Sequence, residues 1–239
     1  MSAQRLDTRR RTGRRLVLTA AAIVLLAACG DDPPPPAAQD PPVPDSLPGS
    51  PPELEGALPE PADLGDAWTD LGAVPLEQRG FPGCPETGAI TAGEGSARRG
   101  EAQSLYAEGE LPAPTFAVSI SAWESPDVAQ DRLTAFAAVA TRCRSFEQEL
   151  LDGRQAAISV AERVPPPLGD AAAAVVLTID PEQGPTSFLD TVAVRLGDLI
   201  VLTDGERVEG EPDASLEQAR FDDLTRQAVE KAQRLLVPD

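Results

Sequence analysis

Residues 26–29, Leu-Ala-Ala-Cys, stand at the end of an apolar run that follows a cluster of arginines. A basic segment, an apolar segment and small residues before a cysteine form the export signal of a bacterial lipoprotein. We therefore expect residues 1–28 to be a signal peptide that is cut off before Cys29. Lipid, palmitate included, would then attach to Cys29 and hold the protein in the cell membrane on its extracytoplasmic face. Arg14-Arg15 is compatible with twin-arginine export, but the sequence does not decide between this route and the general secretory route.

The segment after the cysteine is rich in proline and poor in residues that a core can bury. It contains the runs Pro33-Pro34-Pro35-Pro36 and Pro51-Pro52. Such a composition favours an extended, partly polyproline II chain. We expect residues 29–57 to be a disordered spacer and residues 58–239 to form one folded domain. A proline-rich ligand for another protein's domain is the alternative, but a spacer needs fewer assumptions.

The charge and the residue types exclude several classes of function. The chain has 39 acidic and 20 basic residues; one acid and six bases precede Cys29, so 38 and 14 remain, a net charge of −24. This charge repels phosphate backbones, so we expect no nucleic-acid partner. Histidine is absent and Lys231 is the single lysine, which excludes catalysis by a Ser-His-Asp triad and phosphate loops. We expect no catalytic residues, no metal site and no cofactor.

Alternating and continuous apolar patterns predict six strands. The clearest lies at 115–123, where Phe116, Val118 and Ile120 alternate with smaller residues. Between the last two strands, Gly197-Asp198 is a two-residue connection with glycine first, which favours a type II′ hairpin. The predicted strands are 102–107, 115–123, 156–163, 171–179, 188–196 and 199–203.

Helical spacing predicts three helices. A short one opens the domain around residues 58–68 and buries Trp68. A long one begins at the cap Ser125-Pro126-Asp127 and carries Cys143 and Leu150 on its buried side. The last runs from about 213 to 236. Together with the strands, these predict an α+β fold, a twisted antiparallel sheet with its two main helices packed on one face.

Two cysteines remain once Cys29 carries lipid. Cys84 lies in a region rich in glycine and proline, and Cys143 lies on the long helix. In an oxidising compartment the simplest expectation is a disulfide between them. A redox-active dithiol and a metal site are the alternatives, although redox pairs usually lie close in sequence and a metal needs more ligands.

The order of these segments resembles the extracytoplasmic sensor domain of the PknH family, which also occurs in actinobacterial lipoproteins. The resemblance covers residues 58–237 and rests on Trp68, Cys84, Cys143 and the segments Leu168–Ala171 and Val192–Val201. It implies a twisted antiparallel sheet with helices and a cleft for a ligand. Kinase-type members of the family have two disulfides and this chain can form only one, so the rim of the cleft can differ. The chain also has no kinase domain, so kinase signalling does not carry over.

One face of the predicted sheet is a candidate ligand cleft. Its small polar side chains, indole and guanidinium groups suit an amphipathic or anionic ligand; an ordinary solvated sheet face is the alternative. The candidate residues are Ser119, Ser121, Trp123, Arg163 and Arg195.

We therefore predict a non-catalytic, sensor-like surface lipoprotein that binds an unknown small-molecule or protein ligand. The alternatives are an accessory subunit that docks an envelope enzyme or transporter, and a lipid carrier. A carrier needs a deep apolar cavity, a sensor a shallow mixed cleft, and an interaction module an exposed apolar patch.

Overall fold

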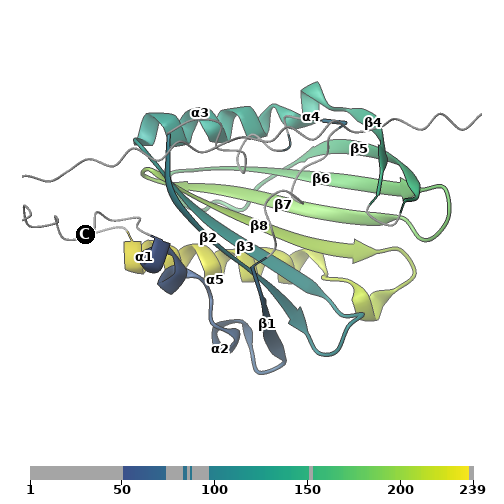
Figure 1. Ribbon diagram of the computed structural model, residues 1–239, viewed down its shortest axis with the longest axis horizontal. Coiled ribbons are helices and arrows are strands. Elements are labelled where there is room, and N and C mark those ends of the chain that lie inside the picture. Colours follow the sequence, from purple (N-terminus) through teal and green to yellow (C-terminus); the bar gives the residue numbers. More distant parts are fainter. Residues whose placement is uncertain (1–50, 74–82, 85–86, 88–96, 151–152, 237–239) are drawn as a thin grey trace, which may run out of the picture. The chain divides into compact units, whose positions relative to one another are not determined.

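In a computed structural model, eight strands form one antiparallel sheet in the order β1-β2-β3-β8-β7-β6-β5-β4. The structure describes residues 51–73, 83–84, 87, 97–150 and 153–236, all within one compact unit. This confirms the predicted α+β class with an antiparallel sheet (Figure 1). The helices are α1 (Pro51–Ala57), α2 (Pro61–Leu64), α3 (Pro126–Ala137), α4 (Val139–Arg142), the 3-10 helix η3 (Pro212–Ala214) and α5 (Gln218–Leu236). The strands are β1 (Trp68–Gly72), β2 (Arg98–Glu108), β3 (Thr115–Trp123), β4 (Ser145–Glu149), β5 (Gln155–Arg163), β6 (Ala171–Pro181), β7 (Ser187–Leu196) and β8 (Leu199–Val208).

The centre of the sheet follows the sequence pattern closely. β3 has the predicted bounds, and β7 and β8 pair around Gly197-Asp198. Gly197 has a φ of +60°, whereas no residue other than glycine has a positive φ in the described part. A positive φ at Gly197 followed by a negative φ at Asp198 is what a type II′ turn requires, and it explains why glycine stands first in the turn.

The helix α5 covers one face of the sheet, which we call the α5 face. Alternate residues of β3, β7 and β8 point to this helix and form the larger apolar core with it. Lys231 of α5 donates to Asp63 Oδ2 at 2.8 Å and so ties α5 to α2. The core of this face includes Phe116, Val118, Ile120, Val192, Val194, Val201, Phe221, Leu224 and Ala228.

The helix α3 covers the opposite face, which we call the α3 face (Figure 1). Ala193, Ile200 and Leu202 alternate in sequence with the residues that α5 covers, and they pack with Leu133 and Phe136 of α3. The prediction that both main helices pack on one face is therefore wrong. The centre of the sheet is buried on both sides, which accounts for the nearly continuous apolar sequence of the first half of β6.

The long helix predicted to run to Leu150 is interrupted. Its cap is as predicted: the Ser125 side chain accepts a hydrogen bond from the Val128 N–H. The helix ends at Ala137, the short α4 follows, and the chain then enters β4 at Ser145. β4 was not predicted, although Phe146 and Gln148 alternate in burial with exposed neighbours as edge-strand residues do.

The folded body begins earlier than predicted. α1 falls inside the range assigned to the spacer, yet Leu54 and Ala57 are fully buried against α5 and the sheet. Two prolines are tolerated in the first turn of a helix because the N–H groups there have no intrahelical partner. The helix predicted around 58–68 is shortened to α2, and Trp68 opens β1 with its side chain buried.

The signal peptide, Cys29 and the spacer up to residue 50 lie outside the described residues, so their assignments stay predictions. Within the described part, no helix is long and apolar enough to cross a membrane.

Candidate binding groove

Three of the five predicted cleft residues are buried beneath α3. Ser119 and Ser121 are each 3% exposed and Trp123 is fully buried. The Trp123 indole N–H donates to Ser121 Oγ at 3.0 Å, and the Arg132 guanidinium lies over the indole, 5.1 Å from its centroid. These side chains therefore belong to the core of the α3 face, where no ligand can reach them without displacing the helix.

The two arginines lie on different faces of the sheet. Arg195 lies on the α3 face, where its Nη1 donates to the Gly197 carbonyl at 3.1 Å and lies 3.4 Å from Asp170 Oδ2. Arg163 lies on the α5 face and donates to both carboxylate oxygens of Asp222. The five predicted residues consequently do not line one cleft. The prediction failed because it treated the second face of the sheet as open, whereas α3 covers it.

An open groove lies instead on the α5 face, at β4, β5 and β6. α5 packs on β3, β7 and β8, and the outer strands carry exposed side chains such as Glu147, Ser159 and Asp180. The groove has a volume of about 510 Å³, within the range of small-molecule sites. Its lining consists of Ser145, Phe146, Glu147, Ala157, Ile158, Ser159, Thr178 and Asp180.

The register of the strands arranges this lining in two rows. Glu147, Ala157 and Asp180 pair across the three strands and form a carboxylate row. Two residues further along, three hydroxyl side chains form a parallel hydroxyl row. Residues two apart on a strand share a face, so both rows face the same side as Arg163. The hydroxyl row consists of Ser145, Ser159 and Thr178.

The hydroxyl row continues across the sheet into an aromatic and a charged side chain. Thr178 pairs with Phe188 of β7, and Phe188 pairs with Arg207 of β8. The Arg207 guanidinium lies 4.9 Å from the centroid of the Phe188 ring. Its Nε donates to Asp190 Oδ2 at 3.1 Å.

Four charged residues link this part of the sheet to α5, and we call them the charged quartet: Arg163, Asp190, Arg207 and Asp222. The Asp190 side chain is 2% exposed and contacts both arginines. Arg163 pairs with Asp222 of α5 at 2.9 Å, and its guanidinium lies over the Phe221 ring. Two positive and two negative charges balance within the quartet, so it adds no net charge to the groove.

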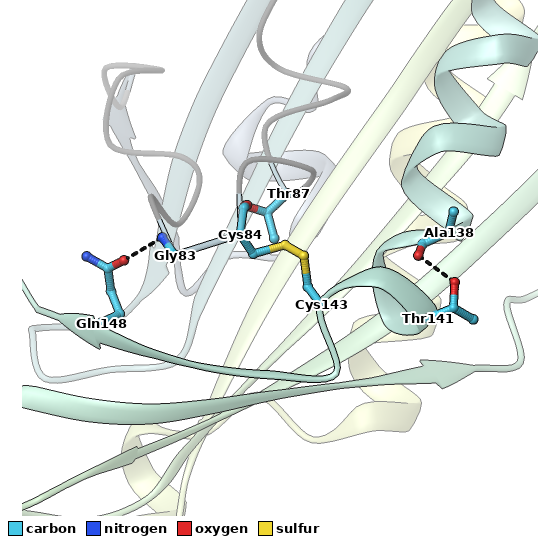
Figure 2. The surroundings of a disulfide bond; sticks show 7 residues. All are labelled: Gly83, Cys84, Thr87, Ala138, Thr141, Cys143 and Gln148. Carbon is cyan, nitrogen blue, oxygen red and sulfur yellow. Dashed lines mark hydrogen bonds between the residues drawn. A yellow bond between two sulfur atoms is a disulfide. The ribbon is translucent and has the colours of Figure 1, made fainter.

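The disulfide holds the strand that forms the outer side of the groove. Cys84 is bonded to Cys143 with their α-carbons 5.8 Å apart, which confirms the predicted pair. Cys143 lies two residues before β4, and the Gly83 N–H donates to Gln148 Oε1 of β4 at 3.0 Å (Figure 2). Both contacts fasten the segment at residues 83–84 to the beginning and the end of β4.

The described residues of the groove supply carboxylate and hydroxyl groups for binding. Among them we find no nucleophile with a neighbouring base. The hydroxyl groups of the groove have no imidazole beside them, since the sequence contains no histidine. Within the described residues, no group of three or more acidic or cysteine side chains is placed to hold a metal ion. Sequence reasoning missed the groove because it missed β4, and only the register reveals which residues of three strands lie side by side.

The fold is similar to that of the extracellular domain of PknH from Mycobacterium tuberculosis. The two share 11% identity with a TM-score of 0.59, over 79% of this chain and 98% of that one. A Mycobacterium smegmatis protein described as an Rv0999 ortholog aligns at 16% identity and a TM-score of 0.39, over 73% and 97% of the two chains. No protein-family model matches the sequence, and no curated protein matches it significantly. The first similarity confirms the predicted PknH-like sensor-domain fold.

Proposed function

We propose that this chain is a non-catalytic extracytoplasmic lipoprotein, held on the membrane through Cys29, whose domain binds a ligand in the groove. The observation that carries the proposal is an open groove of about 510 Å³ on the outer strands of a sheet whose centre is buried beneath helices. The fold of an extracellular sensor domain and the export signal in the sequence support the same location.

The lining favours a polar ligand over a lipid. A lipid carrier requires a deep apolar cavity, whereas the groove presents Ser145, Ser159 and Thr178 beside Glu147 and Asp180. An accessory subunit that docks an envelope enzyme would leave the groove empty, so the state of the groove separates these two functions.

The anchor is tested in cells that express the whole chain. Wild-type protein labelled with an alkyne analogue of palmitate should carry the label and remain with the membrane fraction. A Cys29→Ser variant should carry no label and be released. Label on the serine variant, or membrane retention without label, would contradict the anchor.

The groove is tested by native mass spectrometry of the exported Cys29→Ser chain. We expect a bound adduct, and we expect it to disappear in Ala157→Trp, which fills the middle of the carboxylate row from an exposed position. Glu162→Trp is the matched control, because Glu162 is exposed on the same strand but on the other face. An adduct that survives Ala157→Trp would show that the ligand binds outside the groove and contradict the proposed site. An empty wild-type protein would favour an accessory subunit.

A further inference from the structure

The two carboxylates of the groove face each other across one small residue. Glu147 and Asp180 pair with Ala157 from either side. Neighbouring strands lie about 4.8 Å apart, so the α-carbons of the two acids are roughly 10 Å apart. Only a methyl group stands between them, which leaves room for a ligand group that both carboxylates can reach.

Neither carboxylate has a cationic partner among the residues that the structure describes. Asp180 accepts a hydrogen bond from Thr186 Oγ1 at 3.2 Å, and the Glu147 side chain forms no hydrogen bond or ion pair with a described residue. Other acids of this face are neutralised, as Asp190 and Asp222 are within the charged quartet. The groove therefore has a net negative charge that the protein itself leaves uncompensated in the described part.

The hydroxyl row adds a second recognition element at a fixed distance. Ser159 and Thr178 lie two residues along their strands from Ala157 and Asp180, which corresponds to about 7 Å. Hydroxyl groups both donate and accept, so they suit an amide, a hydroxyl or a carbonyl of a ligand.

We propose that the groove binds a molecule with a primary ammonium group, placed between Glu147 and Asp180, and a hydrogen-bonding group about 7 Å away on the hydroxyl row. This deepens the proposed function and rests on it. An extended lysine side chain, with its ammonium at the end of a four-carbon stem, separates charge and backbone amide by a comparable distance. The source is either a small amine or a lysine of a partner protein, which share this chemistry.

The charge of the whole protein supports a cationic ligand. After loss of the signal peptide the net charge is −24, which raises the local concentration of cations and speeds their encounter. An anionic ligand would have to overcome this field, and the described residues that line the groove include no arginine or lysine that could pair with it.

The probe is Nα-acetyl-lysine methylamide, titrated into the exported Cys29→Ser chain by calorimetry. Its neutral comparator is Nα-acetyl-norleucine methylamide, which has nearly the same shape without the charge. We expect the lysine compound to bind at least tenfold tighter than the norleucine compound, and to bind more weakly as salt rises from 50 to 500 mM, because the salt screens the charges.

Three variants locate the binding. Glu147→Gln and Asp180→Asn should each weaken binding of the lysine compound about tenfold, since each removes a charge-assisted hydrogen bond of the exposed groove. Glu162→Gln changes the net charge by the same amount on the other face of β5 and should leave the affinity unchanged. Equal effects of all three variants, or equal binding of the two probes, would overturn the proposal.

Two further measurements are needed. One shows whether the amine belongs to a small molecule or to a partner protein, and the other tests the ammonium proposal separately from the proposed function. A pentapeptide with a central lysine that binds at least tenfold tighter than the blocked residue assigns the ammonium to a partner protein, and equal affinities assign it to a small molecule. A native adduct that Ala157→Trp removes but that contains no amine would refute the ammonium proposal and leave the groove a ligand site. Absence of both adduct and probe binding would refute both.

Discussion

The Tyr106 hydroxyl donates a hydrogen bond of 2.6 Å to the carbonyl oxygen of Pro59. Tyr106 lies on β2, fully buried on the α5 face, and Pro59 lies between α1 and α2. The bond therefore fixes the N-terminal helices to the sheet. It also satisfies a backbone carbonyl at the point where the chain enters the domain.

Burial raises the pKa of Tyr106 to about 12. In the unfolded chain a tyrosine ionises near pH 10. The folded state therefore holds the proton more tightly, and the stability gained from it is complete below pH 10 and lost as the pH rises from about 10 to 12. Because Tyr106 is the single tyrosine of the chain, absorbance at 295 nm follows its ionisation directly.

Tyr106→Phe should lower the free energy of unfolding at pH 7 by about 1–3 kcal/mol, because the Pro59 carbonyl loses its partner. Urea unfolding measures this loss. The stability of the variant should then change less between pH 10 and 12 than that of the wild type. A wild-type tyrosine that titrates near pH 10 while the protein remains folded would contradict the buried hydrogen bond.

The disulfide makes a second prediction, which concerns both stability and the groove. The double variant Cys84→Ala and Cys143→Ala should lose about 4 kcal/mol, the loop-closure entropy for a separation of 59 residues. Because the bond fastens the segment at residues 83–84 beside β4, hydrogen exchange at residues 145–149 should become faster than at β7 and β8. Uniformly faster exchange over the whole sheet would show that the disulfide has no local role at the groove.

Two glycines with the same φ angle provide a matched test of the packing between the start of β6 and the β7-β8 hairpin. Gly169 and Gly197 both have a φ of +60°. A β-carbon on Gly169 would lie 2.5 Å from the Arg195 carbonyl oxygen, whereas nothing lies within 4 Å of one on Gly197. Asp170 completes the contact, because its Oδ2 accepts from the Gly197 N–H at 2.7 Å.

Gly197→Ala should cost about 1–3 kcal/mol, the penalty of a positive φ at a residue other than glycine. Gly169→Ala should lower the free energy of unfolding clearly more. It has the same backbone penalty, and its β-carbon must also displace the Arg195 carbonyl. Urea unfolding of both variants measures the difference. Equal costs would mean that the close approach of residue 169 to the hairpin contributes nothing.

How far the sequence predicts this molecule depends on what each pattern encodes. The strand at 115–123 and the hairpin turn are local patterns, and both were found at their places. Burial on the α3 face was missed because its positions on β3 include Ser119 and Ser121, small polar residues that look solvated. The Trp123 indole that contacts Ser121 belongs to the same strand, but the helix α3 that covers both serines docks through tertiary contacts that a strand pattern does not encode.

The groove could not be predicted from local patterns. Glu147, Ala157 and Asp180 meet only through the register of three strands, and a shift of one residue would turn each of them to the other face. The helix α1 was missed for a different reason. Its buried residues Leu54 and Ala57 have helical spacing, but the surrounding prolines led to the prediction of a disordered spacer.

The last prediction concerns the buried pair of Arg163 and Asp190, whose Nε and Oδ1 atoms lie 3.4 Å apart. Asp190→Ala would leave the guanidinium groups of Arg163 and Arg207 without their shared carboxylate. Removal of the shared carboxylate costs about 1–3 kcal/mol, because Asp222 still compensates Arg163 while Arg207 loses its hydrogen-bond acceptor. We expect a loss of that size in urea unfolding.

Asp223→Ala is the control, since Asp223 pairs with Arg226 on the exposed surface of α5 and should leave the urea midpoint unchanged. Asp190 lies beside Phe188, which adjoins the hydroxyl row, so the variant should also weaken binding of any ligand that occupies the row. A stable Asp190→Ala protein with unchanged ligand affinity would show that the charged quartet supports neither the sheet nor the groove.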